Sequence, residues 1–226
     1  IAAVQTSEGV RHGEKRLAVT LAPTLERLSG PERLALGYAA LLPADHVPLP
    51  WLRSLVGAHH HEMVQDAEPG YPEPWRTLVR RLFSLRLLQA AGAVDADGRR
   101  LVVRMHRLVQ ELVRKQNGDA TAEMLPVLSA HLQSRADFIW DGWVQREHRW
   151  EIEPLVAAAW HMGSAHIAYK VAAQPLRELG SLAEAKRLLQ KAVALWERTL
   201  DPNDTLMAAG YSGLAQVEQN LGNLAE

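Results

Sequence analysis

The first residues that could do chemistry form a glycine and lysine run near the start of the chain. Gly9, Gly13 and Lys15 resemble the glycines and lysine of a phosphate-binding loop, Gly-x-x-x-x-Gly-Lys-Ser/Thr. That loop needs four residues between its glycines so that backbone amides surround the phosphates, and a hydroxyl after the lysine for magnesium. Here only three residues separate the glycines, Glu14 precedes the lysine and Arg16 follows it. We therefore predict that this chain by itself has no catalytic residues and hydrolyses no ATP.

A histidine-rich segment is the second candidate for chemistry. His61 and Glu62 begin a sequence like the zinc-binding helix His-Glu-x-x-His, but Gln65 stands where the second imidazole is needed. His59 and His60 precede them, and adjacent histidines without suitably placed carboxylates are typical of an exposed loop. We therefore predict no metal site here.

The composition is that of an ordinary globular chain. It has 226 residues, of which 47% are hydrophobic and 23% charged, and its length favours two packed units over one. A net charge of -1 provides no overall attraction to nucleic acid or anionic lipid. The absence of cysteine and of any membrane-length apolar run predicts a cytoplasmic protein. The chain starts at Ile1 rather than Met and stops at Glu226 within a repeat, so we expect a part of a longer protein.

The elements of the first half are expected to be helices followed by a short hairpin. Apolar periodicity bounded by proline and glycine predicts helices at residues 20–28, 31–42, 48–56, 74–88 and 106–116. The turn sequence Asp-Ala-Asp-Gly at 95–98 lies between two short apolar runs, which predicts one β-hairpin. Helices followed by one hairpin are the elements of a winged helix.

The second half contains an internal repeat. Leu-Gly-Ser-Leu-Ala-Glu at 179–184 recurs as Leu-Gly-Asn-Leu-Ala-Glu at 221–226, an offset of 42 residues. This spacing is typical of paired-helix repeats. Ala173 and Ala215 occupy matching positions, where we expect two helices to approach closely. Pro175 lies inside the first repeat helix, so we expect that helix to kink or restart.

These residues resemble a tetratricopeptide repeat of the long, kinesin-light-chain-like variety over residues 165–226. The family's Gly-x-x-x-Glu-Ala core is present as Gly180-Ser181-Leu182-Ala183-Glu184-Ala185. The resemblance implies a solenoid of helix pairs that binds a protein or peptide ligand. Positions expected to face its groove are Gln174, Arg177, Gln216, Gln219 and Asn220.

The first half resembles the winged-helix segment of bacterial NB-ARC ATPases, the signal-transduction ATPases with numerous domains (STAND). The resemblance rests on Leu-Leu-Pro-Ala-Asp-His-Val-Pro-Leu at 41–49, followed by Trp51 and Leu52, and on Val-Arg-Met-His-Arg-Leu-Val-Gln at 103–110. The expected fold is mainly α, a winged-helix domain with one small β-hairpin followed by an α-solenoid. The expected layout is an upstream domain end or linker at 1–16, the winged helix at 17–118, a connecting helical segment at 119–164 and the truncated repeats at 165–226.

The family resemblance also implies a role for one histidine. In these ATPases a Met-His-Asp motif places histidine against the β-phosphate of ADP, and Met105-His106 match its first two positions. Arg107 stands where the family has aspartate, so only His106 is carried over. The resemblance implies no cofactor for this chain alone. In the longer protein it implies ADP or ATP with magnesium. The implied partner of the winged helix is an upstream nucleotide-binding domain of the same protein.

Two other functions remain open from the sequence. Residues 76–115 carry ten basic and three acidic side chains, a local net charge of +7. A winged-helix transcriptional regulator with a repeat-based sensor would use this excess to contact DNA. Its candidate contacts are Arg76, Arg80, Arg81, Arg99 and Arg100. The balanced overall charge and the absence of an Asn or Gln reader on the outer face of 74–88 argue against it. The other alternative is a passive scaffold whose repeats bind a peptide.

Overall fold

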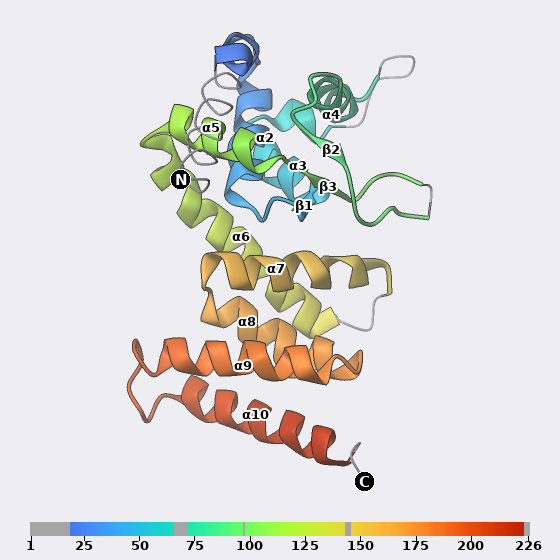
Figure 1. Cartoon of the computed structure of the whole chain (residues 1–226). Coiled ribbons are helices and arrows are strands. Elements are labelled where there is room, and N and C mark those ends of the chain that lie inside the picture. Colours follow the sequence, from blue (N-terminus) through green and yellow to red (C-terminus); the bar gives the residue numbers. More distant parts are fainter. Residues whose placement is uncertain (1–18, 66–71, 97, 143–145, 224–226) are drawn as a thin grey trace, which may run out of the picture. The chain divides into compact units, whose positions relative to one another are not determined.

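The computed structural model is mainly helical and describes residues 19–65, 72–96, 98–142 and 146–223 (Figure 1). The chain divides into two compact units. Unit 1 takes its residues from 1–92 and 102–125, and unit 2 from 93–101 and 126–226. The prediction of a mainly α fold is confirmed, but the β component is a three-stranded sheet rather than one hairpin. The glycine and lysine run at 9–16 lies outside the described residues.

Unit 1 is built around a central helix. Its helices are a segment at 19–26, α2 (Gly30–Leu41), α3 (Leu49–Gly57), η1 (His61–Met63), α4 (Pro74–Ser84) and α5 (Arg107–Asn117). A capping box starts α2, because the Ser29 hydroxyl accepts from the Glu32 amide at 3.4 Å and the Glu32 carboxylate accepts from the Ser29 amide at 2.7 Å. Helix α2 contacts α3, α4 and α5. Its fully buried side chains therefore form the middle of the unit 1 core.

Helix α4 ends earlier than the sequence predicts. The predicted helix ran to residue 88, whereas α4 ends at Ser84. Arg86 has a φ of 56°, in the left-handed region that non-glycine residues rarely adopt. The Leu87 amide then donates to the Leu82 carbonyl at 3.0 Å, which turns the chain back and buries Leu87 and Leu88. No glycine marks this reversal in the sequence, which is why periodicity alone placed the end too late.

The small sheet of unit 1 joins three distant segments. Strands β1 (Val47–Pro48), β2 (Gln89–Ala90) and β3 (Val102–Arg104) have the antiparallel order β1-β3-β2. Val47 pairs with Val103, and Gln89 pairs with Arg104. Between β2 and β3 the expected turn is present, since the Asp95 amide donates to the Arg99 carbonyl at 2.9 Å. Strand β3 leads directly into α5, so the sheet positions the start of that helix.

Unit 2 is a layer of helices in which the elements from η2 to α10 each pack on their neighbours in sequence (Figure 1). The elements are α6 (Ala120–Gly142), which begins in unit 1, η2 (Arg146–Glu151), α7 (Ile152–Met162), α8 (Ala165–Val171), η3 (Ala172–Leu176), α9 (Leu182–Trp196) and α10 (Thr205–Asn223). Left-handed glycines end α7 and precede α9, with φ of 66° at Gly163 and 75° at Gly180. Leu128, Leu132, Leu155, Leu188 and Leu189 are fully buried.

Pro175 is accommodated without breaking the helical path. Residues Ala172–Leu176 form a single π-helical turn between α8 and the following helical residues. The wider turn accommodates the ring and the missing amide of Pro175, and the Pro175 carbonyl still accepts from the Leu179 amide at 3.1 Å. The expected irregularity at this proline is therefore a π-turn.

The close approach of α9 and α10 depends on glycines. Ala173 is buried as expected, and Ala215 is exposed among the described residues. A Cβ atom on Gly210 would lie 2.8 Å from a Val193 methyl carbon, and one on Gly213 would lie 3.3 Å from a Leu189 methyl carbon. These two glycines permit the contact.

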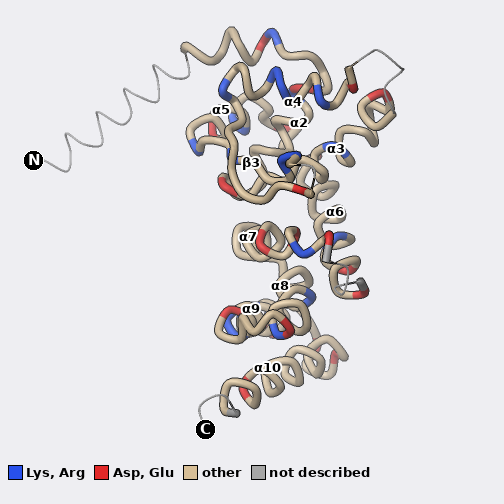
Figure 2. The backbone as a smooth tube through the Cα atoms, turned by 90° about the vertical axis from the view of Figure 1, so that its right-hand side faces the viewer, with Lys and Arg blue, Asp and Glu red and all other residues tan. Residues whose placement is uncertain are grey.

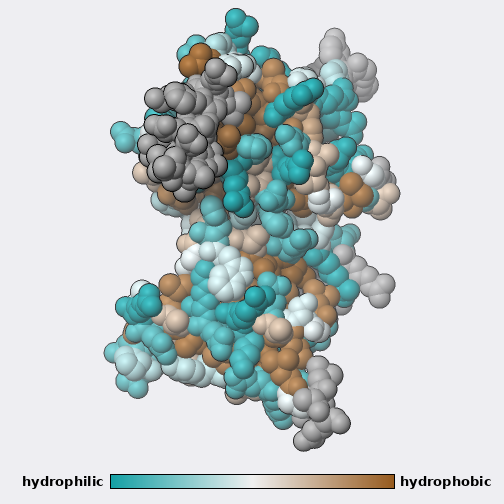
Figure 3. Space-filling model, viewed as in Figure 1, coloured by the Kyte–Doolittle hydropathy of each residue, from teal (hydrophilic) through white to brown (hydrophobic). Residues whose placement is uncertain are grey.

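The visible surface of unit 2 mixes hydrophobic patches with hydrophilic side chains (Figure 3). Within the described ranges, no helix combines the length and apolarity that crossing a bilayer requires.

Candidate functional site

His106 is the N-terminal cap of α5. It follows β3 in an extended conformation, with φ -60° and ψ 135°, and its ring is exposed. The ring atom Nδ1 accepts a hydrogen bond from the Leu108 amide at 3.2 Å. An imidazole nitrogen that accepts a hydrogen bond carries no proton, so the hydrogen of the neutral ring is assigned to Nε2. The cap therefore leaves Nε2–H as the ring's remaining donor.

The backbone on both sides of His106 is fixed by buried groups. Met105 is 1% exposed, and its amide donates to the Ala44 carbonyl at 2.8 Å. One turn into α5, the buried side chain of Gln110 donates from Nε2 to the carbonyls of Ala39 at 3.2 Å and Leu42 at 2.9 Å. These carbonyls belong to the end of α2, which lacks further helical donors. Gln110 thus ties α5 to α2 and holds His106 at one place on unit 1.

Gln110 was missed by sequence reasoning, although the sequence contains a signal for it. It lies between Val109 and Val113, on the side of α5 that the apolar spacing assigns to the core. A glutamine on a buried face needs partners for its amide, because an unsatisfied buried polar group is costly. The identity of those partners, about 70 residues earlier in the chain, could not be read from the sequence.

The arrangement at His106 suits an anion. The first-turn amides of an α-helix carry a partial positive charge that favours negative groups nearby. Arg107, the first residue of α5, is exposed and adds a full positive charge. In the part of the chain that the structure describes, no cluster of three or more His, Asp or Glu side chains is placed to hold a metal ion. The chemistry available at this helix end is hydrogen bonding to an oxyanion.

The five predicted partner-binding residues lie on two elements of unit 2. Gln174 is half-buried in the π-turn, and Arg177 follows it at the end of the same helix. Gln216 is on α10, and the Arg177 guanidinium donates to its side-chain carbonyl. Gln219 and Asn220 are exposed one turn further along α10. The structure therefore brings Arg177 and Gln216 together, with Gln219 and Asn220 beyond them and Gln174 partly covered.

A second polar cluster in unit 2 was not found from the sequence. The Asp137 carboxylate of α6 lies 3.0 Å from Nε2 of His166 and 3.1 Å from Nζ of Lys170, both on α8. Burial by itself raises the pKa of Asp137, but the hydrogen bond from Lys170 and the charges of His166 and Lys170 leave that pKa below its usual value. The Lys170 ammonium also lies 5.0 Å from the Trp140 ring centroid, and Trp140 stacks on Tyr169 at 5.6 Å. The cluster joins α6 to α8.

The arginines proposed as DNA contacts have different surroundings. Arg76 and Arg80 are exposed on α4, and no side-chain partner is found for either among the described residues. Basic positions in the region of α4 are blue in Figure 2. Arg81 instead pairs with the nearly buried Glu32 at 3.2 Å and donates to the Arg27 carbonyl at 3.3 Å. Arg99 and Arg100 are exposed in residues 93–101, which belong to unit 2. Arg81 is therefore engaged within unit 1, whereas Arg76 and Arg80 are available to a partner.

Comparisons with known proteins found no matching family model, no matching curated protein and no matching solved structure.

Proposed function

We propose that this chain is the regulatory portion of a STAND-class nucleotide-dependent signalling switch. In this proposal unit 1 is a winged helix of the NB-ARC type that senses ADP through His106, and unit 2 begins a tetratricopeptide solenoid that binds a protein or peptide signal. The order α2, β1, α3, α4, β2, β3, which combines three of the helices with an antiparallel sheet, supports the first part. The layered helices α8, α9 and α10 support the second.

The observation that carries the proposal is the hydrogen bonding of His106. Its Nδ1 atom is occupied by the Leu108 amide, so Nε2–H is the donor left for a phosphate oxygen. The Met105 and Gln110 bonds fix the ring's attachment point, which a sensor needs if it is to distinguish two nucleotide states. The nucleotide, ADP or ATP with magnesium, is held in this proposal by an upstream domain of the same cytoplasmic protein. The chain itself is then a regulator and not an enzyme.

The experiment uses the full-length protein with His106→Ala and His106→Ser. A serine can cap α5 through its hydroxyl but offers no imidazole donor, so it separates the cap from the sensor. A hydrogen bond to a charged group contributes about 1.5–3 kcal/mol, so ADP should dissociate at least about tenfold faster from both variants. Basal signalling should rise in both, while the serine variant keeps the thermal stability of the unmodified protein.

Two results would contradict the sensor role. One is unchanged ADP release and unchanged basal activity in both variants. The other is a defect in the alanine variant that serine fully rescues, since His106 would then act only as a helix cap. The proposed mechanism is allosteric because His106 would contact the ADP-bound state differently from the ATP-bound state.

A DNA-binding transcriptional regulator is the second candidate, and the exposed pair Arg76 and Arg80 is the observation in its favour. Each phosphate contact steepens the dependence of log affinity on log salt by about 0.9. If each arginine of the pair contacts one phosphate, the double variant Arg76→Ala, Arg80→Ala should reduce the steepness of that slope by about 1.8. A duplex affinity that is equal for both proteins at every salt concentration removes this candidate.

A passive scaffold is the third candidate. In that case a peptide binds the repeats, substitution of Arg177 and Gln216 weakens it, and nucleotide has no effect on its affinity. The switch predicts instead that ADP and ATP change the affinity of the full-length protein for the peptide.

A further inference from the structure

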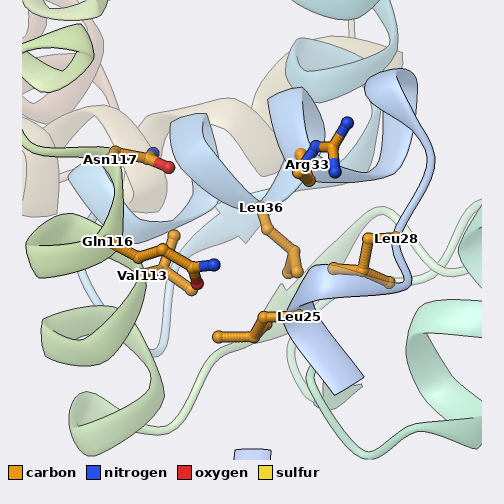
Figure 4. Close-up of a pocket in the computed structure, with 7 residues that line it drawn as sticks. All are labelled: Leu25, Leu28, Arg33, Leu36, Val113, Gln116 and Asn117. Carbon is orange, nitrogen blue, oxygen red and sulfur yellow. The ribbon is translucent and has the colours of Figure 1, made fainter. Parts of the chain in front are cut away.

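Apolar surface that a partner could reach lies on α10 of unit 2. The apolar residues that line the pocket of unit 1 in Figure 4 are only 1–4% exposed, so a partner could not reach them. On α10, by contrast, Leu206 is 40% exposed and Tyr211 is 49% exposed. Leu214 is half-buried, and Ala215 is exposed. Helix α10 therefore presents apolar side chains to solvent.

The internal repeat shows how the same positions are covered elsewhere in unit 2. The offset of 42 residues aligns Leu214 and Ala215 of α10 with Ala172 and Ala173 of η3. Ala172 is 0% exposed and Ala173 is 6% exposed. Element η3 packs against α9, the helix that follows it. The matched positions are thus buried in the first repeat, where a second helix packs on them, and open in α10.

The matched tyrosines show the same difference. Tyr169 of α8 lies between two rings, with the Trp140 centroid at 5.6 Å and the Trp196 centroid of α9 at 5.4 Å. Its counterpart Tyr211 is exposed, and its hydroxyl donates to the Glu197 carboxylate at 2.7 Å. This hydrogen bond holds the Tyr211 ring at the surface of α10. Tyr211 is therefore positioned to receive an aromatic ring in the way that Tyr169 receives Trp196.

Helix α9 defines the chemistry that an occupant of this surface needs. Its buried face alternates leucines with small residues, which fill space and allow close approach of the backbones. The residues of that face are Leu182, Ala185, Leu188, Leu189, Ala192, Val193 and Trp196. At the edge of the exposed surface, Glu218 stands where η3 has the buried Leu176. The Glu218 carboxylate already pairs with Lys186 at 3.1 Å, so its charge does not require a partner on the occupant.

We propose that Tyr211, Leu214 and Ala215 form a docking surface for an amphipathic helix with the apolar pattern of α9 and an aromatic residue in the place of Trp196. The continuity of the repeat selects this occupant, because the matched surface of α8 and η3 is covered by α9. In the longer protein the occupant is the second helix of the repeat that α10 begins. The inference rests on the repeat architecture proposed for unit 2 and is independent of the proposed ADP contact of His106.

The test extends the full chain in register with the repeat. Because residues 179–184 recur at 221–226, a copy of residues 185–200 joined after Glu226 supplies a helix with the α9 pattern. A second extension has glutamine in place of each leucine, valine and tryptophan of the copy, which removes the apolar face but keeps a good helix former. Ala215→Glu places a charge on the docking surface. Ala183→Glu is the matched control, because it makes the same change at an exposed position of α9.

The readout is hydrogen exchange of the α10 amides. The copied extension should slow this exchange at least about tenfold, because the amides of a covered helix open less often. The glutamine extension should not slow it, Ala215→Glu should abolish the protection, and Ala183→Glu should leave the protection intact.

Unchanged exchange in the chain with the copied extension, or equal protection by both extensions, would overturn the proposal. Self-association of the unextended chain that Ala215→Glu abolishes would overturn it in favour of a second copy as the occupant. Neither result affects ADP release from the His106 variants, so the docking surface and the nucleotide sensor can fail separately.

Discussion

Units 1 and 2 are both mainly helical, but they are held together in different ways. In unit 1 the decisive contacts join segments that are far apart in sequence. Gln110 binds carbonyls of residues 39 and 42, Arg81 pairs with Glu32, and β3 pairs with β1. In unit 2 the elements from η2 to α10 each pack on their neighbours in sequence. The side-chain links Arg135–Glu151, Asp137–His166 and Arg177–Gln216 span 16, 29 and 39 residues, which is less than these links of unit 1 span.

This difference separates a cooperative domain from a nearly one-dimensional array. Long-range links that converge on one central helix should make unit 1 open as a whole. Nearest-neighbour packing should let the helices of unit 2 respond to damage locally, as in repeat proteins. In the proposed switch, the first property would keep the sensing histidine in position, and the second would let the signal-binding surface respond to varied ligands.

The largest expected effect comes from Arg135→Met in unit 2. Glu151 is 1% exposed, and both of its oxygens accept from the Arg135 guanidinium, with His148 at 3.0 Å from one of them. Removal of Arg135 takes away the guanidinium that binds both oxygens of this buried carboxylate, which should cost about 3 kcal/mol. Hydrogen exchange should accelerate strongly in η2 and α7 and only weakly in α10.

The matched control is the double variant Arg135→Met, Glu151→Met, which removes both charges. Its stability should return to within about 1 kcal/mol of the unmodified chain, because a well-packed apolar pair can replace a buried ion pair. Equal acceleration of exchange from α6 to α10 would contradict the local response that we assign to unit 2.

Gln110→Leu should cause the next largest loss of stability, and it tests the cooperativity of unit 1. The substitution leaves the Ala39 and Leu42 carbonyls without their side-chain donor, which should cost about 2 kcal/mol. Exchange should then accelerate together in α2, α3, α4 and α5. The control is Glu111→Ala at the exposed neighbouring position, with no expected change. Acceleration confined to α5 would remove the contrast between the units.

Two glycine substitutions on α10 should change the free energy of unfolding by smaller amounts, one lowering it and the other raising it. Alanine in place of glycine favours a helix by about 1 kcal/mol. At Gly210 the added methyl would lie 2.8 Å from Val193 and 3.2 Å from Trp196, and overpacking of this kind costs about 1–3 kcal/mol. At Gly222 nothing lies within 4 Å. Urea unfolding should show a net loss of about 1 kcal/mol for Gly210→Ala and a small gain for Gly222→Ala, whereas two gains would mean that α9 and α10 are not tightly packed.

The smallest expected effect is a pH dependence from His131 on α6. Burial lowers the pKa of His131 and the Arg135 charge lowers it further, while Glu151 partly opposes them. The unfolded chain then takes up the proton first as pH falls below about 6.5. Stability from this residue is therefore complete at pH 7.5 and declines as the pH passes down toward the lowered folded-state pKa. Urea unfolding at pH 7.5, 6 and 5 should show a shallower decline for His131→Gln, and an identical decline would refute this assignment.

Much of the fold could be predicted because local signals mark it. Ser29 and Pro31 predicted the start of α2, and apolar spacing placed α5 within one residue of its observed ends. Strand β1 was missed because two residues have no periodicity, and Val47 is a strand residue only through its pairing with Val103. The reversal at Arg86 was missed because its left-handed backbone carries no glycine.

The candidate site was predicted in part. The resemblance selected His106, but its role as a helix cap depends on a side-chain rotamer that the sequence does not encode locally. Arg81 was grouped with Arg76 and Arg80 by composition, and its pairing with Glu32 follows from the packing of α2 against α4. The Asp137–His166–Lys170 cluster joins two helices 29 and more residues apart, a distance at which spacing carries no signal.

The most direct test of the central claim is to read the coding sequence upstream of Ile1 over roughly the 200–300 residues that one or two domains occupy. The account predicts a Gly-x-x-x-x-Gly-Lys-Ser/Thr loop followed by a strand that ends in acidic residues, in frame with this chain. An upstream region without a phosphate-binding loop would contradict it, because His106 would then have no nucleotide to sense.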